Sequence, residues 1–315
     1  MAQKQVSDQP SVQELIAKSN SKKQKQMVEK LIPAILFLIA SISVLTTIGI
    51  VATLIVETVI FFKEIPVLSF LFGTEWYPFS SKAPTFGILP LIAGTLKVTI
   101  IAAIVAVPFG ISSAIFLSEY ASDTTRRIIK PILEVLAGIP TIVYGFFALT
   151  FVTPLLQQFI PDLKIFNALS PGIVVGIMIL PMIASLSEDA MSSVPNSIRE
   201  GALAMGSTKL EVALKVVLPA ALSGIIASIV LAISRAIGET MIVSLAGGST
   251  PKFDFDVTGS IQTMTAYIVQ ISSGDAGYGT TIYYSIYSVG FTLFLFTLVM
   301  NLIAHAISKK YREEY

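Results

Sequence analysis

The chain has 315 residues, of which 54% are hydrophobic and only 13% are charged, and its formal net charge is +1. A soluble domain carries about 25% charged residues because water must hydrate its surface, so much of this surface contacts something other than water. The small net charge gives no general attraction to nucleic acid, and the absence of cysteine excludes disulfides, thiolate catalysis and cysteine metal sites.

The first 30 residues are polar and rich in lysine, and we predict a mobile polar cytoplasmic tail over 1–30. They lack the short apolar core and small-residue cleavage site of a secretory signal peptide. The membrane domain is expected to cover 31–310, and 311–315 to form a short cytoplasmic C-terminus.

Six apolar stretches are long enough to cross a membrane. A spanning helix needs about 20 mainly apolar residues for about 30 Å of hydrocarbon. The stretches are 31–62, 88–117, 132–159, 171–186, 219–246 and 282–307. The fourth is the weakest, since it is short and contains Pro181, which a bundle tolerates only where neighbouring helices satisfy the freed backbone groups. The sequence therefore predicts an all-α polytopic membrane protein with about six transmembrane helices.

The distribution of lysine and arginine predicts the orientation. If the N-terminus is cytoplasmic, the inner segments hold fifteen of these residues and the outer segments hold four. Because basic residues are enriched in cytoplasmic loops, we expect both termini in the cytoplasm of a cell (inner or plasma) membrane protein.

Two outer segments are predicted to be folded. Residues 63–87 carry Trp76, Tyr77 and Pro78 among apolar residues, which suits an element at the membrane interface. Residues 247–281 open with two glycines and contain a possible short helix over 261–271.

Lys97 lies in the second span, about 14 Å below its outer end at 1.5 Å per residue. It can face an anion in a pathway or extend its amine to the outer interface, and both readings stay open. Glu119, after this span, is expected in a solvated loop. In the third span, Gly138-Ile139-Pro140 and Tyr144-Gly145 predict a break or a close helix approach.

The loop over 188–218 carries the signals of two short helices. Ser197 and Glu200 have capping-box spacing, as do Thr208 and Glu211. Gly206 stands where a C-terminal glycine would end the first helix. Pro219 then fits the start of the fifth span. By these signals alone the segment is a capped loop between helices 4 and 5, a common arrangement.

Arg235 and Glu239 lie four residues apart in the fifth span, which would put them on one helix face and allow an ion pair. A charge at the bilayer centre costs roughly 2.5–3.5 kcal/mol or more, so it needs a partner or a purpose. The pair can hold the bundle together, or Arg235 and Lys97 can meet an oxyanion such as phosphate in passage. Glu239 would then accept a hydrogen bond from HPO4, which sulfate cannot donate.

The loop resembles the coupling loop of type I ABC importer permeases. That family has E-A-A, three residues, G, nine residues, I, one residue and L-P. Here the same spacing gives Glu200-Gly201-Ala202, Gly206, Val216 and Leu218-Pro219, with Gly201 and Val216 as conservative departures. The resemblance implies that Glu200, Gly201, Ala202, Gly206, Leu218 and Pro219 couple the membrane helices to an ATP-hydrolysing subunit.

Four further runs resemble the C-type permease subunit of the phosphate-specific (Pst) importer. They are LFGTEWYPF (71–79), FGILPLIAGTLKVT (86–99), LAGIPTIVYGFF (136–147) and SRAIGETM (234–241). The resemblance covers about residues 30–310 and implies a permease domain, a phosphate substrate and a non-enzymatic transport subunit. The word phosphate comes from this resemblance, with the cation placement as support.

The resemblance also implies partners. These are a second homologous permease subunit, an ATPase dimer, an external phosphate-binding protein near 63–87 and 247–281, and the lipid bilayer, with no nucleic acid. The chain has no G-x-x-x-x-G-K-[ST] loop, so ATP and Mg would be bound by the ATPase and no cofactor by this chain. The alternatives are a permease for sulfate or molybdate, and an ion-driven secondary transporter; no nucleophile–base pair favours a membrane enzyme.

Overall fold

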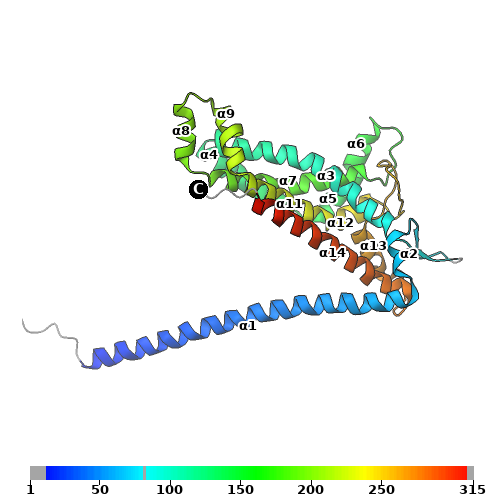
Figure 1. Cartoon of the computed structure of the whole chain (residues 1–315), viewed down its shortest axis with the longest axis horizontal. Coiled ribbons are helices and arrows are strands. Elements are labelled where there is room, and N and C mark those ends of the chain that lie inside the picture. The colour runs from blue at the N-terminus through cyan, green and yellow to red at the C-terminus, as the bar shows by residue number, and fades with distance from the viewer. Residues whose placement is uncertain (1–11, 81–82, 311–315) are drawn as a thin grey trace, which may run out of the picture. The chain divides into compact units, whose positions relative to one another are not determined.

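The computed structural model describes residues 12–80 and 83–310, and these are largely helical (Figure 1). The long helices and their immediate continuations are α1 (Val12–Glu64), α3 (Leu89–Ile115), α4 (Asp123–Ala137), α5 (Thr141–Phe147), α6 (Thr153–Gln157), α7 (Leu169–Ser192), α11 (Leu222–Ile237), α12 (Met241–Ala246) and α14 (Thr281–Lys310). The short elements are α2 (Val67–Phe72), α8 (Asn196–Ala204), α9 (Lys209–Val212), α10 (Leu218–Ala220), α13 (Met264–Gln270) and the strands β1 (Trp76–Tyr77) and β2 (Thr85–Phe86). Wide π-helical turns are η1 (Phe116–Tyr120), η2 (Ala148–Val152), η3 (Ala213–Val217) and η4 (Ile271–Asp275).

Among the described residues, four helical segments are long and apolar enough to cross a membrane: Leu31–Glu64, Leu89–Tyr120, Leu169–Ser192 and Thr281–Ile307. Two bent pairs raise the number to six if each pair is one span. They are Asp123–Ala137 with Thr141–Gln157, bent by 85°, and Lys209–Ala220 with Leu222–Ile237, bent by 73°. The predicted all-α polytopic fold is confirmed, and the third and fifth stretches are broken helices.

Helix α1 begins earlier than the predicted first span. Residues 12–30 are helical, which differs from the mobile tail expected over 1–30; Gln, Lys and Glu are good helix formers, so the helix continues back from the apolar segment. Residues 1–11 of that tail and the C-terminus 311–315 lie outside the described residues. The part of α1 up to Ile55 forms a separate unit, and Val56 begins the second unit, which holds the rest of the chain.

In this second unit, α7 packs against α3 and α11, and α11 packs against α14. Glycines bring α3 and α7 close together. A Cβ on Gly176 would lie 2.9 Å from the carbonyl oxygen of Ala102, and one on Gly172 would lie 2.7 Å from the Ile101 side chain. Small residues at helix contacts are typical of membrane bundles. The predicted fourth span, considered the weakest from sequence, is thus a continuous 24-residue helix with many buried side chains, and Pro181 lies inside it.

A second core lies beside the β1–β2 hairpin and is aromatic. Trp76 is only 1% exposed and makes edge-to-face contacts with Phe70, Phe86 and Tyr267. The prediction of a folded segment over 63–87 is confirmed, but Trp76 packs inside the protein, because the hairpin turns its ring toward α13. The short helix expected over 261–271 is present as α13.

Candidate functional site

The fifth predicted span breaks at Glu239. Helix α11 ends at Ile237, just before Gly238, and α12 starts at Met241. The buried carboxylate of Glu239 accepts a hydrogen bond from the Ile242 amide (3.2 Å), and the Glu239 carbonyl accepts one from the Thr265 hydroxyl (2.7 Å). Glu239 therefore satisfies the first turn of α12, where carboxylates are favoured by free N–H groups and the helix dipole.

The predicted Arg235–Glu239 ion pair is wrong. The four-residue spacing brings side chains together only on a continuous helix, and this helix stops between them. Within residues 12–80 and 83–310, the half-buried Arg235 has no hydrogen bond or salt bridge; its charge acts on the nearby Tyr144 phenol. Five N–H donors of this guanidinium are available for an anion.

The third span positions Tyr144 next to this break. Helix α4 ends at Ala137, just before Gly138, and α5 starts after Pro140, so the predicted interruption is confirmed. The Tyr144 hydroxyl donates to the Leu136 carbonyl across the bend (2.8 Å). A Cβ on Gly145 would lie 3.1 Å from the Met241 carbonyl oxygen, so α5 and α12 approach closely at this glycine.

Lys97, the second predicted pathway cation, has partners. Its amine lies 2.5 Å from Asp254 Oδ1 and donates to the Asp256 carbonyl at 3.0 Å, and its side chain is 9% exposed. The Lys97 amine thus turns to the loop after α12, where a carboxylate already occupies it. Local sequence patterns carry no signal for this pair, since its members are 157 positions apart.

The loop between α7 and α11 forms the predicted bent helix pair. Gly206 has φ +90, which favours glycine, and separates α8 from α9. Thr208 and Glu211 make a complete capping box. The capping box predicted at Ser197 and Glu200 is wrong, because α8 begins one residue earlier, after Pro195, and has no side-chain cap.

The coupling residues fall into two groups. Glu200, Gly201, Gly206 and Pro219 are exposed, whereas Ala202 and Leu218 pack on the small apolar core beneath the loop. Met205 is 87% exposed and Leu203 is 44% exposed. The exposed side of the loop therefore offers apolar side chains, which suit contact with another protein. Pro219 lies just before the bend at Ala221.

Arg199 fixes α8 to the membrane helices. Its guanidinium pairs with Glu119 at 3.1 Å and donates to the Met191 carbonyl at 2.7 Å and to the Val194 carbonyl. Glu119, which we expected in a solvated loop, therefore pairs with Arg199 and holds α8 against η1. The partner is 80 positions away, so local sequence could not reveal it.

A second charged cluster lies at the same end of α7. Glu188 is fully buried and pairs with Arg126 and with Lys130 (2.8 Å). Lys130 also reaches Asp189 at 2.6 Å. Arg126 and Lys130 lie on one face of α4, and this spacing is the only sequence signal of the cluster. The cluster ties α4 to α7 eight residues before α8 begins.

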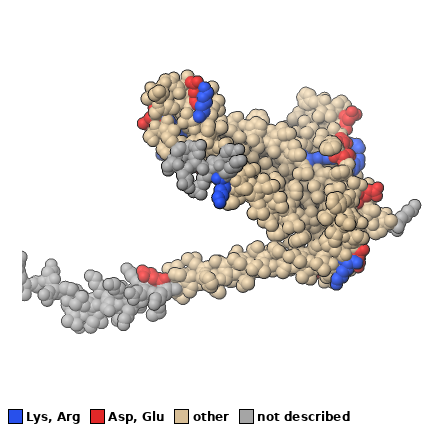
Figure 2. Space-filling model, in the orientation of Figure 1, with Lys and Arg blue, Asp and Glu red and all other residues tan. Residues whose placement is uncertain are grey.

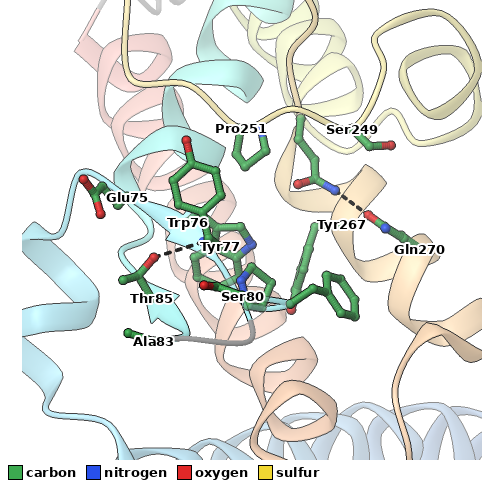
Figure 3. A pocket seen from close by; sticks show the side chains of 13 residues that line it. Glu75, Trp76, Tyr77, Ser80, Ala83, Thr85, Ser249, Pro251, Tyr267 and Gln270 are labelled. Atoms are coloured by element: carbon green, nitrogen blue, oxygen red, sulfur yellow. Dashed lines mark hydrogen bonds between the residues drawn. The ribbon is translucent and has the colours of Figure 1, made fainter.

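Charged side chains on the face in Figure 2 gather over the α8–α9 end of the second unit and over its opposite end, with a largely uncharged surface between. At that opposite end, residues of both predicted outer segments line one pocket of about 480 Å³. Glu75, Tyr77 and Thr85 come from the hairpin, and Ser249 and Gln270 come from the later segment (Figure 3). Within the described residues, no group of three His, Asp or Glu side chains could hold a metal ion.

Comparison with known sequences identifies the family. The profile described as "Binding-protein-dependent transport system inner membrane component" matches residues 106–313. The chain is 36% identical over 246 residues to the probable ABC transporter permease protein YqgH of Bacillus subtilis, covering 77% of this chain and 78% of that protein. It is 34% identical over 257 residues to the phosphate transport system permease protein PstC of Xylella fastidiosa, covering 75% and 77%.

Solved structures share the fold at low identity. A bacterial alginate ABC transporter, in complex with an alginate pentasaccharide-bound periplasmic protein, matches with a TM-score of 0.61 at 16% identity, covering 93% of this chain and 96% of that one. The MetNI methionine ABC transporter in an inward facing conformation matches with a TM-score of 0.53 at 17% identity, covering 72% and 95%. The chain is a multi-pass inner membrane protein and belongs to the family of binding-protein-dependent transport system inner membrane components.

Proposed function

We propose that this chain is the permease subunit of an ATP-driven importer of inorganic phosphate and forms half of its translocation pathway. The single observation that carries the proposal is the relationship to PstC proteins, which are named phosphate transport system permeases and match about three quarters of this chain. Arg235 adds physical support, because a half-buried guanidinium without a hydrogen bond or salt bridge in the described chain suits a passing oxyanion.

The α8–α9 loop is proposed to bind the ATPase subunit. Its surface exposes Met205 and Leu203, and Arg199 joins α8 rigidly to the membrane helices through Glu119. Motion of a bound ATPase would therefore be passed to α7 and α11 and would not be absorbed in a flexible loop. In this proposal Glu200, Gly201, Ala202, Gly206, Leu218 and Pro219 shape the coupling element, and the ATPase binds ATP and Mg.

Two further partners are proposed: an external phosphate-binding protein and a second permease subunit. With the α8–α9 end and both termini in the cytoplasm, the pocket of Figure 3 faces outward. Its walls come from both outer segments, which supports docking of an external phosphate-binding protein there. A second, homologous permease subunit would supply the other half of the pathway.

Uptake by the reconstituted complex tests the proposal. Proteoliposomes that contain this chain with its permease and ATPase partners should take up labelled phosphate from loaded binding protein when ATP is supplied at the ATPase face. Excess sulfate or molybdate should compete weakly. Uptake of sulfate or molybdate in place of phosphate would make the chain a permease for another oxyanion. Uptake driven by an ion gradient without ATP would make it a secondary transporter.

A further inference from the structure

Lys97 and the loop after α12 form an ion pair that the proposed pathway does not explain. The ammonium group comes from α3, and its carboxylate partner, Asp254, comes from a segment without helix or strand. The Lys97 side chain is 9% exposed, whereas that of Asp254 is 40% exposed. The cation is therefore largely enclosed by the protein, whereas the anion that neutralises it is less enclosed.

The surroundings of Lys97 are apolar. Leu96, Ile100, Phe253 and Phe255 are among the residues that line a cavity of about 390 Å³ beside the pair. An ammonium group next to such a surface is costly to leave without an anion, because few waters can replace the lost charge partner. A resident carboxylate removes this cost while no other anion is present.

The loop is fixed on one side of Asp254 and open on the other. The Val257 carbonyl accepts hydrogen bonds from the amides of Ala168 and Leu169, at 3.1 and 3.2 Å. On the other side of Asp254, Phe253 is 56% exposed. Between Asp254 and the fixed Val257, Phe255 is fully exposed. Asp254 Oδ1 also accepts a hydrogen bond from the Asp256 amide (3.2 Å), and the Lys97 amine also donates to the Asp256 carbonyl (3.0 Å). Asp254 can leave Lys97 by breaking the first of these bonds and rotating its side chain away, without separating the helices.

An oxyanion can take the place of Asp254 chemically. An ammonium group has three N–H donors and donates hydrogen bonds to carboxylate or phosphate oxygens alike. A phosphate dianion carries twice the charge of a carboxylate, so it is attracted more strongly at the same distance. Asp254 and the anion then compete for one cation.

We propose that Asp254 is a resident counter-anion that occupies Lys97 until the transported oxyanion displaces it, and that Asp254 thereby sets the affinity of the outer pathway for that anion. The proposal rests on the proposed phosphate import. It explains how a nearly buried cation can bind the substrate weakly enough to release it, since the carboxylate returns as the anion leaves.

The apparent KM of ATP-driven phosphate uptake tests the proposal in proteoliposomes that contain the full complex. Asp254→Asn should lower the KM roughly threefold, the scale of a partly exposed ion pair. Lys97→Gln should raise the KM, and Asp254→Asn should then have no further effect on it. Asp162→Asn is the matched control, because Asp162 is exposed near the same end and has no salt bridge among the described residues.

An unchanged KM in Asp254→Asn, or an equal change in the Lys97→Gln background, would overturn the proposal. A purely structural link would lower the maximal rate and leave the KM. Failure of wild-type complex to import phosphate at all would instead reject the proposed function.

A second measurement does not depend on transport by the Asp254 variant. The chain has no cysteine, so Phe255→Cys can carry a fluorophore at a fully exposed position in a complex whose partners lack reactive thiols. Phosphate should change its fluorescence, and the change should be absent in the Lys97→Gln background. A signal that does not respond to phosphate, or one that survives Lys97→Gln, would contradict displacement.

Discussion

Glu239 and Arg235 occupy opposite sides of one helix break, and this separation gives them different roles. Glu239 is buried, and one of its carboxylate oxygens accepts a hydrogen bond from the Ile242 amide. The N–H donors of Arg235 make no hydrogen bond within the described residues. The carboxylate of Glu239 can accept a hydrogen bond from the O–H group of HPO4. Fully ionised sulfate has no O–H group to donate, so the carboxylate only repels it. We propose that Glu239, which caps α12, also contributes to the choice of anion.

Glu239→Gln should blur the discrimination between phosphate and sulfate. The glutamine oxygen can still accept the Ile242 amide, so the helix start is preserved, but the negative charge is lost and an N–H donor is gained. The ratio of sulfate to phosphate inhibition constants in the uptake assay should fall by about tenfold or more, the scale of one hydrogen bond to a charged group. A ratio equal to that of the wild type would count against this role.

A substitution at Gly94 can test how closely α3 packs against the segment before α13. A Cβ at this position would lie 2.3 Å from the Gln262 carbonyl oxygen, which is backbone and cannot rotate away. Gly94→Ala should destabilise the protein by about 1–3 kcal/mol, the usual cost of overpacking. The melting temperature of the purified complex should fall. Gly49→Ala is the control, since a Cβ there meets nothing within 4 Å; an equal effect of both would refute the packing argument.

The loop that carries Asp254 is ordered by side-chain turns, which makes it an element in its own right. Asp256 Oδ1 accepts hydrogen bonds from the Thr258 hydroxyl (2.6 Å) and the Thr258 amide (2.8 Å). These bonds, and secondarily the charges of Lys97 and Lys164, hold the pKa of Asp256 below its ordinary value of 3.8. A lowered pKa means that folding favours the ionised carboxylate.

The stabilisation from this turn should therefore be complete above pH 3.8 and be lost as the pH falls through the lower, folded-state pKa. Hydrogen exchange of the Thr258 amide, corrected for its intrinsic rate, should lose protection over that acidic range. Asp256→Asn keeps the acceptor oxygen and removes the titration, so its protection should stay level. Protection that falls equally in both proteins would assign the loss to another group.

The bent α8–α9 pair shows how far local sequence can predict an element. Gly206 and the Thr208–Glu211 capping box are local signals, and both features were predicted and are present. The Ser197–Glu200 box failed because Pro195 sets the entry to α8 one residue earlier. Capping patterns thus predict that a helix starts, but a neighbouring proline decides at which residue.

At the scale of the whole molecule, the apolar stretches predicted the order of the helical segments, because the hydrocarbon imposes length and composition on each span separately. Among the described residues, four of the six predicted spans are continuous helices, and the other two correspond to bent pairs. Contacts between distant segments could not be predicted. Lys97–Asp254, Arg199–Glu119 and the cluster around Glu188 join positions far apart in the chain. The Arg235–Glu239 pair failed for the opposite reason, since its local spacing assumed a helix that ends between the two residues.

These long-range contacts also indicate how a movement of the α8–α9 loop is transmitted to the membrane helices. The Glu188 cluster joins α4 to α7, and Arg199 joins α8 to η1 at the end of α3. Arg199 also donates to the Met191 carbonyl of α7, so a movement of the α8–α9 loop would reach α7 and, through the Glu188 cluster, the bent third span. Transport in this account depends on an ATPase bound at the exposed side of the loop.

The initial rate of ATP-driven phosphate uptake in proteoliposomes, measured with Met205 variants, tests this dependence most directly. Met205 is 87% exposed, so its replacement should spare the fold of this chain. Met205→Asp places a charge in the apolar contact and should abolish both uptake and retention of the ATPase, whereas Met205→Leu should preserve both. Normal phosphate uptake by the Met205→Asp complex without bound ATPase would contradict the account.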